Sequence, residues 1–307
     1  MSAATTGRPG AAPRLPSVDV VVPVRGDRGL LADTARALAA QDYPGALCVL
    51  LVDNGDNVDL AAALAPLPDA LLLTGPATGS YAARNAALAS SRADVLAFTD
   101  ADCLPRPDWV RRGVEALRAQ DAPSFVGGAI RVHPRDAAAP TGAELWDCLN
   151  GLQQAAYVEQ GWAATANMLV TREVFDRVGP FDAGRFSGGD RDWGERASRL
   201  GITAHYASAA VVEHPARATL SELHRKIRRV TGGEQDMHRA AGTSLVRATL
   251  HASALRPNSR SILRRSRVLS EHWTGRRVRY VLVAHWVQYY FVLCRLRHDL
   301  SLEPGRE

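Results

Sequence analysis

Lysine and cysteine are both scarce in this chain of 307 residues. A single lysine, Lys226, stands among 37 basic residues, so arginine carries nearly all of the positive charge. The four cysteines are scattered and form no CxxC pair, which argues against a zinc ribbon and against the disulfide framework of a small secreted domain. We therefore expect reduced thiols of an intracellular protein at Cys48, Cys103, Cys148 and Cys294.

Long apolar runs are also missing. The first 16 residues are small and polar and lack the apolar stretch of a signal peptide, so we expect a disordered leader at 1–16. The uncharged segment Tyr280–Cys294 would form a helix of about 22 Å, too short for a hydrocarbon core of about 30 Å. We expect a cytoplasmic protein and leave open a peripheral contact with the inner face of the membrane through residues 270–307.

Charge is unevenly distributed along the chain. Residues 1–220 carry 20 arginines and 25 acidic residues, a net of −5, whereas residues 221–307 carry 17 basic and 7 acidic residues, a net of +10. A basic C-terminal third suits an anionic partner, such as a phosphate-rich ligand or an anionic lipid surface, and it also suits a solvated helical face. We expect no nucleic acid partner.

Apolar runs alternate with helical patterns over the first hundred residues. This alternation predicts an α/β fold in which a mostly parallel sheet is flanked by helices. Ligands of such sheets bind at the carboxyl ends of the strands, where the polar loops 23–27, 53–57 and 99–105 are expected. Strands are predicted at 18–24, 47–52, 70–73 and 95–98, and helices at 30–41, 60–65 and 81–91.

The second half of the chain continues with strands and then becomes helical. From residue 220 onward we predict mostly helix, with a break at Pro257. The region 140–160 is expected to form a helix or loop. Further strands are predicted at 125–132, 167–170 and 205–212, and further helices at 108–120, 172–178 and 190–200.

Two carboxylates follow the fourth predicted strand, at Asp100 and Asp102. Carboxylates separated by one residue can both reach one cation where the chain turns, and Mg²⁺ and Mn²⁺ prefer oxygen ligands that they share with substrate phosphates. Such a cation would neutralise a nucleotide diphosphate and make it a better leaving group. Taken alone the pair is a weak indication, because aspartate-rich turns are common.

A histidine and a further aspartate add to this pattern. His214 ends the last predicted strand, where its imidazole can supply another metal ligand or can be structural. Asp190 follows a glycine turn at the start of a predicted helix, where it can cap the helix or act as a general base toward an attacking hydroxyl. Asp192 points to another side of that helix, so the two carboxylates cannot both face one substrate atom.

A glycine also opens the helix predicted at 81–91. Free backbone N–H groups at Gly79 and Ser80 favour an anion. Arg84, one turn further along, can reach a phosphate or Asp100. Alone, Arg84 would be an ordinary exposed arginine.

Together and in this order, these segments resemble the family-2 glycosyltransferases, which have the GT-A fold, over roughly residues 17–230. Val20–Val24 looks like the opening strand whose end cradles the nucleobase, and Leu51–Gly55 is similar to the turn where an acidic residue contacts the base or ribose. Gly79–Asn85 is similar to the family's helix after a glycine. The nucleotide-sugar site implied by this resemblance consists of Pro23, Val24, Arg25, Asp53, Asn54, Gly79, Arg84, Asp100 and Ala101.

The same resemblance implies the metal and catalytic residues. Thr99–Asp102 is similar to the metal-binding DxD motif, with Asp102 as direct ligand and Asp100 beside it, and His214 corresponds to a metal-binding histidine. Gly188–Asp192 is similar to the catalytic acidic motif, but the usual Glu-Asp pair is Gly189-Asp190 here, so the base is expected at Asp190. A second departure is Asn54, where many relatives have another aspartate.

Cationic and acceptor residues follow from the resemblance as well. The basic stretch His224–Arg229 implies that Arg228 and Arg229 cover the diphosphate. It lacks the Gln-x-x-Arg-Trp pattern of processive relatives, which implies transfer of a single sugar. The residues expected to shape the acceptor pocket, with the region 140–160, are Trp162, Asn167, Asp192 and Trp193.

The resemblance implies an inverting displacement in which an acceptor hydroxyl attacks the anomeric carbon while Asp190 removes its proton. A divalent metal, Mn²⁺ or Mg²⁺, and Arg84 would hold the departing diphosphate. UDP-, GDP- and dTDP-linked donors stay open, and so does the acceptor. We expect a catalytic domain at 17–230, divided into a nucleotide-sugar half (17–120) and an acceptor half (121–230), and a helical region at 231–307.

The segment Tyr280–Cys294 has two interpretations. It can form a helix that packs on the catalytic domain or on a second copy in a homodimer. It can instead lie on a membrane surface, with Trp286, Tyr289 and Tyr290 at the interface and flanking arginines on anionic lipid.

Two other functions were weighed. A nucleotidyltransferase that makes activated sugars normally has a glycine- and arginine-rich loop after the first strand, but the loop 23–27 has one glycine and one arginine. A non-catalytic module that binds anions or lipids would not explain the acidic residues at the strand ends.

Overall fold

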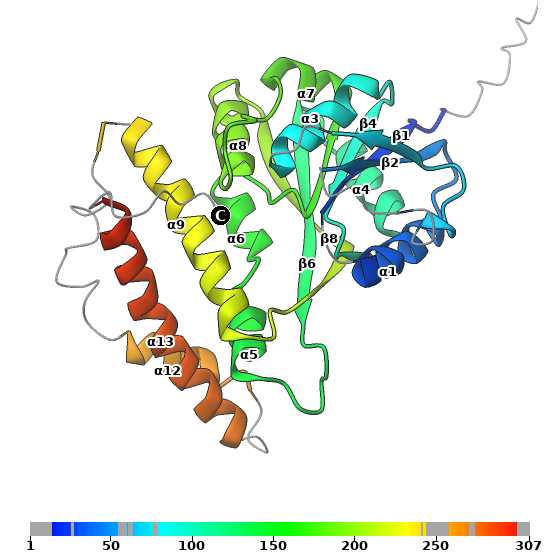
Figure 1. The fold of residues 1–307 in the computed structure, drawn as a ribbon. Helices are drawn as coiled ribbons and strands as arrows, with labels where there is room; N and C mark the ends of the chain where they lie inside the picture. The colour runs from blue at the N-terminus through cyan, green and yellow to red at the C-terminus, as the bar shows by residue number, and fades with distance from the viewer. Residues whose placement is uncertain are drawn as a thin grey trace, which may run out of the picture.

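The computed structural model describes residues 14–25, 28–54, 60, 64–75, 79–240, 242–243, 258–269 and 274–299. Figure 1 shows a central sheet with helices packed on both faces and a helical layer along one side. The strands are β1 (Val18–Val24), β2 (Leu47–Asp53), β3 (Leu71–Thr74), β4 (Val95–Thr99), β5 (Leu104–Pro105), β6 (Ser124–His133), β7 (Asn167–Thr171) and β8 (Thr203–Pro215). The helices are α1 (Arg28–Ala39), α3 (Ser80–Ser90), α4 (Trp109–Arg118), α5 (Gly142–Asn150), α6 (Gln154–Glu159), α7 (Arg172–Val178), α8 (Gly189–Arg199), α9 (Leu220–Ala240), α12 (Ser259–Ser266) and α13 (Thr274–Asp299).

The eight described strands form one mixed sheet in the order β3-β2-β1-β4-β7-β6-β8-β5. β7 runs antiparallel to both of its neighbours, β4 and β6, and β5 runs antiparallel to β8. The other six strands share one direction. The carboxyl ends of β1, β2, β4 and β8 therefore meet at the same edge of the sheet, which is where such folds bind ligands.

Two apolar cores lie on the two faces of this sheet, because successive residues of a strand point to opposite sides. Val20 and Val22 pack with α1 and α4 in one core, while Val21 packs with α3, α7 and α8 in the other. A strand buried on both faces needs an unbroken apolar sequence, as in Val18–Val24. The prediction of a sheet covered by helices on both faces is confirmed.

The short strand β5 determines where the loop after β4 runs. Leu104 pairs with Glu213 and Pro105 with Val212, so the chain crosses from β4, near the middle of the sheet, to β8 near its edge. The loop between β4 and β5 consequently spans the ends of the intervening strands. It brings Asp102 beside His214.

The helical layer in Figure 1 consists of α5, α9, α12 and α13. Leu223 and Ile227 of α9 pack with Ala143 of α5 and with Val287 of α13. α13 therefore packs on the rest of the protein, as one of the two interpretations of Tyr280–Cys294 required. Among the described residues, no helix is both long and apolar enough to cross a bilayer.

The predicted elements agree with the observed ones to within about three residues at each end. The region 140–160 forms the two helices α5 and α6. Residues 61–63 of the predicted helix at 60–65, the break at Pro257 and most of the leader at 1–16 lie outside the described residues. The proposed domain limits stay predictions.

Candidate active site

Hydrogen bonds fix the turn that carries the DxD motif. The Cys103 N–H donates to the Asp100 carbonyl at 3.1 Å, and the Thr34 hydroxyl of α1 donates to the Ala101 carbonyl at 2.9 Å. Ala101 thus contributes a backbone group that holds the loop against α1. The turn directs the two carboxylates apart, so that Asp100 and Asp102 meet different partners.

Asp102 faces His214 at the end of β8. The imidazole is buried, and its Nε2 lies 3.7 Å from the Asp102 carboxylate. Its Nδ1 lies 2.8 Å from the Pro215 carbonyl. Because a carbonyl only accepts, Nδ1 carries a proton, and Nε2 is the ring nitrogen that faces Asp102. A carboxylate and an imidazole nitrogen that face each other fit a divalent cation.

Cys103 lies close to the same two residues. One ligand atom from each of Asp102, Cys103 and His214 falls within a group no wider than 4.8 Å. The thiol is fully buried, and burial raises the pKa of Cys103 well above its usual value. Because Mg²⁺ and Mn²⁺ prefer oxygen and imidazole ligands to sulfur, Asp102 and His214 are the side chains of this group that fit such a cation.

Asp100 is paired with Arg84 of α3. The guanidinium Nη2 lies 2.5 Å from the Asp100 carboxylate, and Arg84 is only 2% exposed. Its Nε–H has no hydrogen-bond partner among the described residues. The helix begins at Gly79, whose φ of 86° favours glycine. A buried guanidinium with an unused donor is suited to an anion.

Asp190 reaches the same edge of the sheet from the start of α8. Its carboxylate accepts hydrogen bonds from the Tyr81 hydroxyl at 3.1 Å and from the Arg191 backbone N–H at 3.0 Å. Tyr81 lies on α3 next to Arg84, whose guanidinium carbon is 5.7 Å from the centre of the Tyr81 ring. A continuous set of contacts therefore joins Asp190 to Asp100.

Burial raises the pKa of Asp190 above its usual value, although the Arg191 N–H, the charge of Arg84 and the Tyr81 hydroxyl oppose this shift. A carboxylate with a raised pKa is the stronger base in its ionised form. Asp190 as a whole residue is partly exposed at this edge, which leaves a route for a substrate proton.

A cleft of about 400 Å³ opens beside Asp102 and His214. Cations from the start of α9 and from neighbouring loops surround it, against one acidic side chain besides Asp102, that of Glu222. A cluster of this kind suits a diphosphate. The basic residues of its lining are Arg135, Arg217, Arg225, Lys226 and Arg229.

Of the two arginines predicted to cover the diphosphate, Arg229 lines this cleft and Arg228 does not. Arg228 lies on another side of α9, where its charge adds to burial in lowering the pKa of His224. Lys226, three residues before Arg229, lines the cleft with it.

The cation cluster is anchored by Asp147 of α5, whose side chain is fully buried. Its carboxylate lies 2.8 Å from the Arg217 Nη1 and 2.8 Å from the Lys226 Nζ. Burial opposes ionisation, yet these two cations hold the pKa of Asp147 below its usual value. Burial, together with the charge of Arg217, lowers the pKa of Lys226 to about 8.

The residues predicted to contact the nucleobase lie at the ends of β1 and β2. Val24 pairs with Asp53 between these strands, and exposed Arg25 follows directly. Asn54 is buried, and its amide oxygen has no hydrogen-bond partner in the described part of the chain. An unpaired buried oxygen is costly, so the position calls for a donor from outside the described residues, such as a ligand. Pro23 is the residue before Val24 in β1 and is half-buried.

Trp162 stacks on Tyr157, with ring centres 4.0 Å apart and planes inclined by 17°. Its indole N–H is buried and unpaired among the described residues. Trp162 packs against Gly194 of α8, the helix that carries Asp190, and the charge of Asp190 adds to burial in raising the pKa of Tyr157.

Asn167 was predicted to shape the acceptor pocket, but its side chain is fully buried. The amide donates to the carbonyls of Ala129 and Ala210, each at 2.9 Å, where the pairing of β6 with β8 is irregular. Its oxygen accepts from the Trp109 indole at 2.8 Å. Asn167 therefore satisfies backbone groups freed by the bulge and has no surface for an acceptor.

Trp193 and Asp192 are likewise engaged by the protein. Trp193 is fully buried, and its indole N–H donates to the Gly179 carbonyl at 3.0 Å. Asp192 pairs with Arg185 and Arg196, each at 3.2 Å, on the side of α8 away from Asp190. In this structure both residues hold α8 in place.

The sequence did not single out Tyr81, Asp147, Tyr157 or Lys226 individually, although Asp147 and Tyr157 lie in the region 140–160 and Lys226 lies in the basic stretch His224–Arg229. Tyr81 lies three residues before Arg84 and Lys226 three before Arg229, so the helical period was the available signal. Tyr157 had no signal beyond its type. Asp147 had none, because its partners lie 70 and 79 residues away in the chain.

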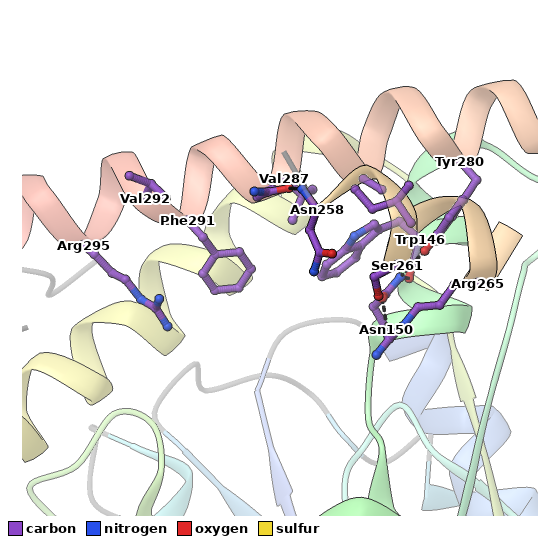
Figure 2. Close-up of a pocket in the computed structure, with 13 residues that line it drawn as sticks. Trp146, Asn150, Asn258, Ser261, Arg265, Tyr280, Val287, Phe291, Val292 and Arg295 are labelled. Carbon is purple, nitrogen blue, oxygen red and sulfur yellow. Dashed lines mark hydrogen bonds between the residues drawn. The ribbon is translucent and has the colours of Figure 1, made fainter. Parts of the chain in front are cut away.

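A second hollow, of about 700 Å³, lies between α5, α12 and α13 (Figure 2). Trp146, Tyr280 and Phe291 line it, with Arg265 toward one end and Arg295 toward the other. None of the residues predicted for the nucleotide, metal or base positions belongs to its lining. The larger hollow is thus separate from the acidic motifs.

Comparison with known proteins decides the family. The profile of Glycosyl transferase family 2 matches residues 19–188. The chain belongs to this family. The match ends before Asp190 and His214, so the roles of these two residues are argued from geometry.

Two relatives are similar to this chain over more than half of its length. The chain is 33% identical over 228 residues to glycosyltransferase AglE of Haloferax volcanii, covering 72% of this chain and 73% of that protein. It is 30% identical over 206 residues to the succinoglycan biosynthesis protein ExoM of Rhizobium meliloti, covering 63% and 66%. These relatives favour the glycosyltransferase prediction over a nucleotidyltransferase or a binding module.

The fold is also that of a solved glycosyltransferase. The mannosyltransferase PcManGT of Pyrobaculum calidifontis, in complex with GDP-Man and Mn²⁺, superposes with a TM-score of 0.63 at 20% identity, covering 95% of this chain and 89% of that one. At this identity the likeness establishes the fold. The predicted GT-A architecture with a helical C-terminal region is confirmed.

Proposed function

We propose that this family-2 glycosyltransferase moves a single sugar from a nucleotide-diphosphate donor to an acceptor hydroxyl by direct, metal-assisted displacement with inversion. One observation carries the proposal: two acidic motifs far apart in sequence meet at one edge of the sheet. Asp102 faces His214 there, and Asp190 is joined to the same loop through α3.

Asp102 and His214 are the side chains that would hold a divalent cation, Mn²⁺ or Mg²⁺. When bound, such a cation supplies positive charge against the diphosphate of the leaving group. The donor set of one carboxylate oxygen and one imidazole nitrogen supports this assignment. The mannosyltransferase with GDP-Man and Mn²⁺ makes a GDP-linked sugar with Mn²⁺ the first pair to test, ahead of UDP- and dTDP-linked sugars.

Asp190 acts as the general base in this proposal. It accepts the proton of the acceptor hydroxyl as the oxygen attacks the anomeric carbon and the bond to the diphosphate breaks. Arg84, Lys226 and Arg229 offer positive charge to the departing diphosphate. A single displacement from the opposite side inverts the anomeric centre.

Unpaired polar atoms indicate where the nucleobase of the donor and where the acceptor would bind. An N–H of the nucleobase would donate to the free amide oxygen of Asn54, beside Asp53 and Arg25. On the other side, Trp162 and Tyr157 offer an aromatic face and an indole donor near Asp190 for the acceptor.

The proposal is tested by ligand-induced thermal shift with UDP-, GDP- and dTDP-sugars, each with Mn²⁺, Mg²⁺ or EDTA. One donor class should raise the melting temperature only with a divalent cation, because ligands that bind the folded state stabilise it by mass action. The variants Asp102→Asn and His214→Ala should reduce this metal-dependent shift, and Asp192→Asn, on the other side of α8, should not. A donor shift that is equal in EDTA and in both site variants would contradict metal assistance.

The stereochemistry has its own test. Slow hydrolysis of the selected donor, with water as acceptor, should release the sugar first as the anomer opposite to that of the donor, as followed by proton NMR. Initial release with the donor's configuration would contradict a single displacement.

A further inference from the structure

Five large apolar side chains lie exposed in a row along α13. The exposed fractions are 57% for Val278, 66% for Leu282, 53% for Trp286, 44% for Tyr289 and 48% for Leu293. They recur every three or four residues, which is the spacing of one helix face. These five residues are called the α13 stripe below.

The opposite face of α13 is joined to the rest of the protein, around the hollow described above. Tyr280, Val287 and Cys294 are buried against α5 and α9, and Arg295 pairs with Glu234 of α9 at 2.9 Å. Figure 1 shows α13 at the outer edge of the molecule, on the side away from the sheet. The α13 stripe is therefore a preformed surface on a fixed helix.

The helices next to this surface are strongly basic. Residues 259–299, from the start of α12 to the end of α13, contain nine arginines and two acidic residues, Glu271 and Asp299. α12 and the turn after it expose Arg260, Arg264 and Arg267, and none of the three makes an ion pair with another described residue. An apolar stripe within a strongly basic region suits a partner that is both apolar and anionic.

We propose that α12 and α13 dock this protein on an anionic lipid bilayer. The α13 stripe enters the interfacial region, where tryptophan and tyrosine are favoured, and the arginines contact lipid phosphates. A second copy of the chain fits this surface less well, because pairing two such faces would bring like charges together. The contact is peripheral, since no described helix can span a bilayer.

Co-sedimentation with vesicles tests the proposal. The full chain should bind vesicles that contain phosphatidylserine and bind vesicles of phosphatidylcholine alone at least about tenfold more weakly, with binding reduced by added salt. Leu282→Glu should weaken binding by at least about tenfold, because it places a charge in the interface. The matched control is Leu72→Glu in β3, a leucine that is 53% exposed, which should bind like the unaltered protein.

A double variant separates charge from the apolar contact. Arg264→Gln with Arg267→Gln should reduce the preference for phosphatidylserine while leaving the unfolding temperature unchanged, as both side chains are exposed. The proposal is overturned if the unaltered protein stays in solution with both vesicle types, or if Leu282→Glu binds undiminished. It is also overturned if light scattering finds a dimer that Leu282→Glu dissociates while vesicle binding is absent.

Discussion

At the scale of single residues, opposing effects determine the pKa of the Asp190 carboxylate. Burial disfavours its charge, while the Tyr81 hydroxyl and the Arg191 N–H donate to it. The first raises the pKa and the second lowers it. Because a base works in its ionised form, activity should be lost as the pH falls through this pKa.

Replacing Tyr81 with phenylalanine tests that balance. The change removes one donor to the carboxylate, so the pKa of Asp190 should rise and the acidic limb of the profile of kcat/KM against pH should move to higher pH. Donor hydrolysis measured across the acidic range gives the limb. Phe181→Leu, a neighbour in the same aromatic cluster, is the control for packing alone. A limb that stays in place or moves to lower pH in Tyr81→Phe would speak against the role of Asp190.

Lys226 gives a second dependence on pH, on the alkaline side. Its pKa is lowered to about 8, so it is charged at pH 7 and largely neutral at pH 9. Donor affinity should therefore fall as the pH rises through 8, and this fall should be smaller in Lys226→Met. Arg228→Met on the same helix, outside the cleft, serves as control. Isothermal titration at two pH values decides, and an identical alkaline loss in Lys226→Met would remove Lys226 from the diphosphate site.

At the scale of elements, α5 and α9 are joined by a buried charge network. Asp147 of α5 holds Lys226 of α9 and Arg217 of the loop before it. The network fixes the start of α9, which supplies most cations of the cleft. The position of the start of α9 is therefore determined by Asp147, which contacts no substrate in this account.

Substitution of Asp147 with asparagine should lower the free energy of unfolding by about 3 kcal/mol or more, since it leaves two half-buried cations without their counter-charge. Denaturant unfolding measures the change. Asp176→Asn on α7 is the matched control: its carboxylate is 64% exposed and pairs only loosely with Arg172, so its effect should stay within about 0.5 kcal/mol. Equal stability of the two variants would contradict the anchoring role.

At the scale of the whole molecule, periodicity in the sequence predicted nearly every described strand and helix. Apolar runs such as Val18–Val24 need burial on both faces, and this requirement determines the architecture. The reversed direction of β7 and the crossing of β5 to β8 were not predictable, because β5 is two residues long and its pairing depends on distant backbone. The domain limits at 17–230 and 231–307 and the cytoplasmic location stay predictions.

The candidate site divides in the same way. Residues carried by motifs, such as Asp102, His214 and Asp190, meet at one edge of the sheet. Those chosen by residue type, such as Asn167 and Trp193, are enclosed by the protein because polar and aromatic side chains serve bulges and cores as readily as ligands. The role of Asp147 could not be predicted, because its ion pairs join residues far apart in the sequence and leave no local pattern.

The central claim is that the Asp190 carboxylate is the base at a donor site built around the loop after β4. The most direct measurement compares Asp190→Asn with the unaltered protein, using the donor and cation selected by thermal shift. Donor affinity should stay within about threefold, while kcat for release of the nucleoside diphosphate should fall by about a thousandfold. Turnover by Asp190→Asn within about tenfold of the unaltered protein would contradict the account.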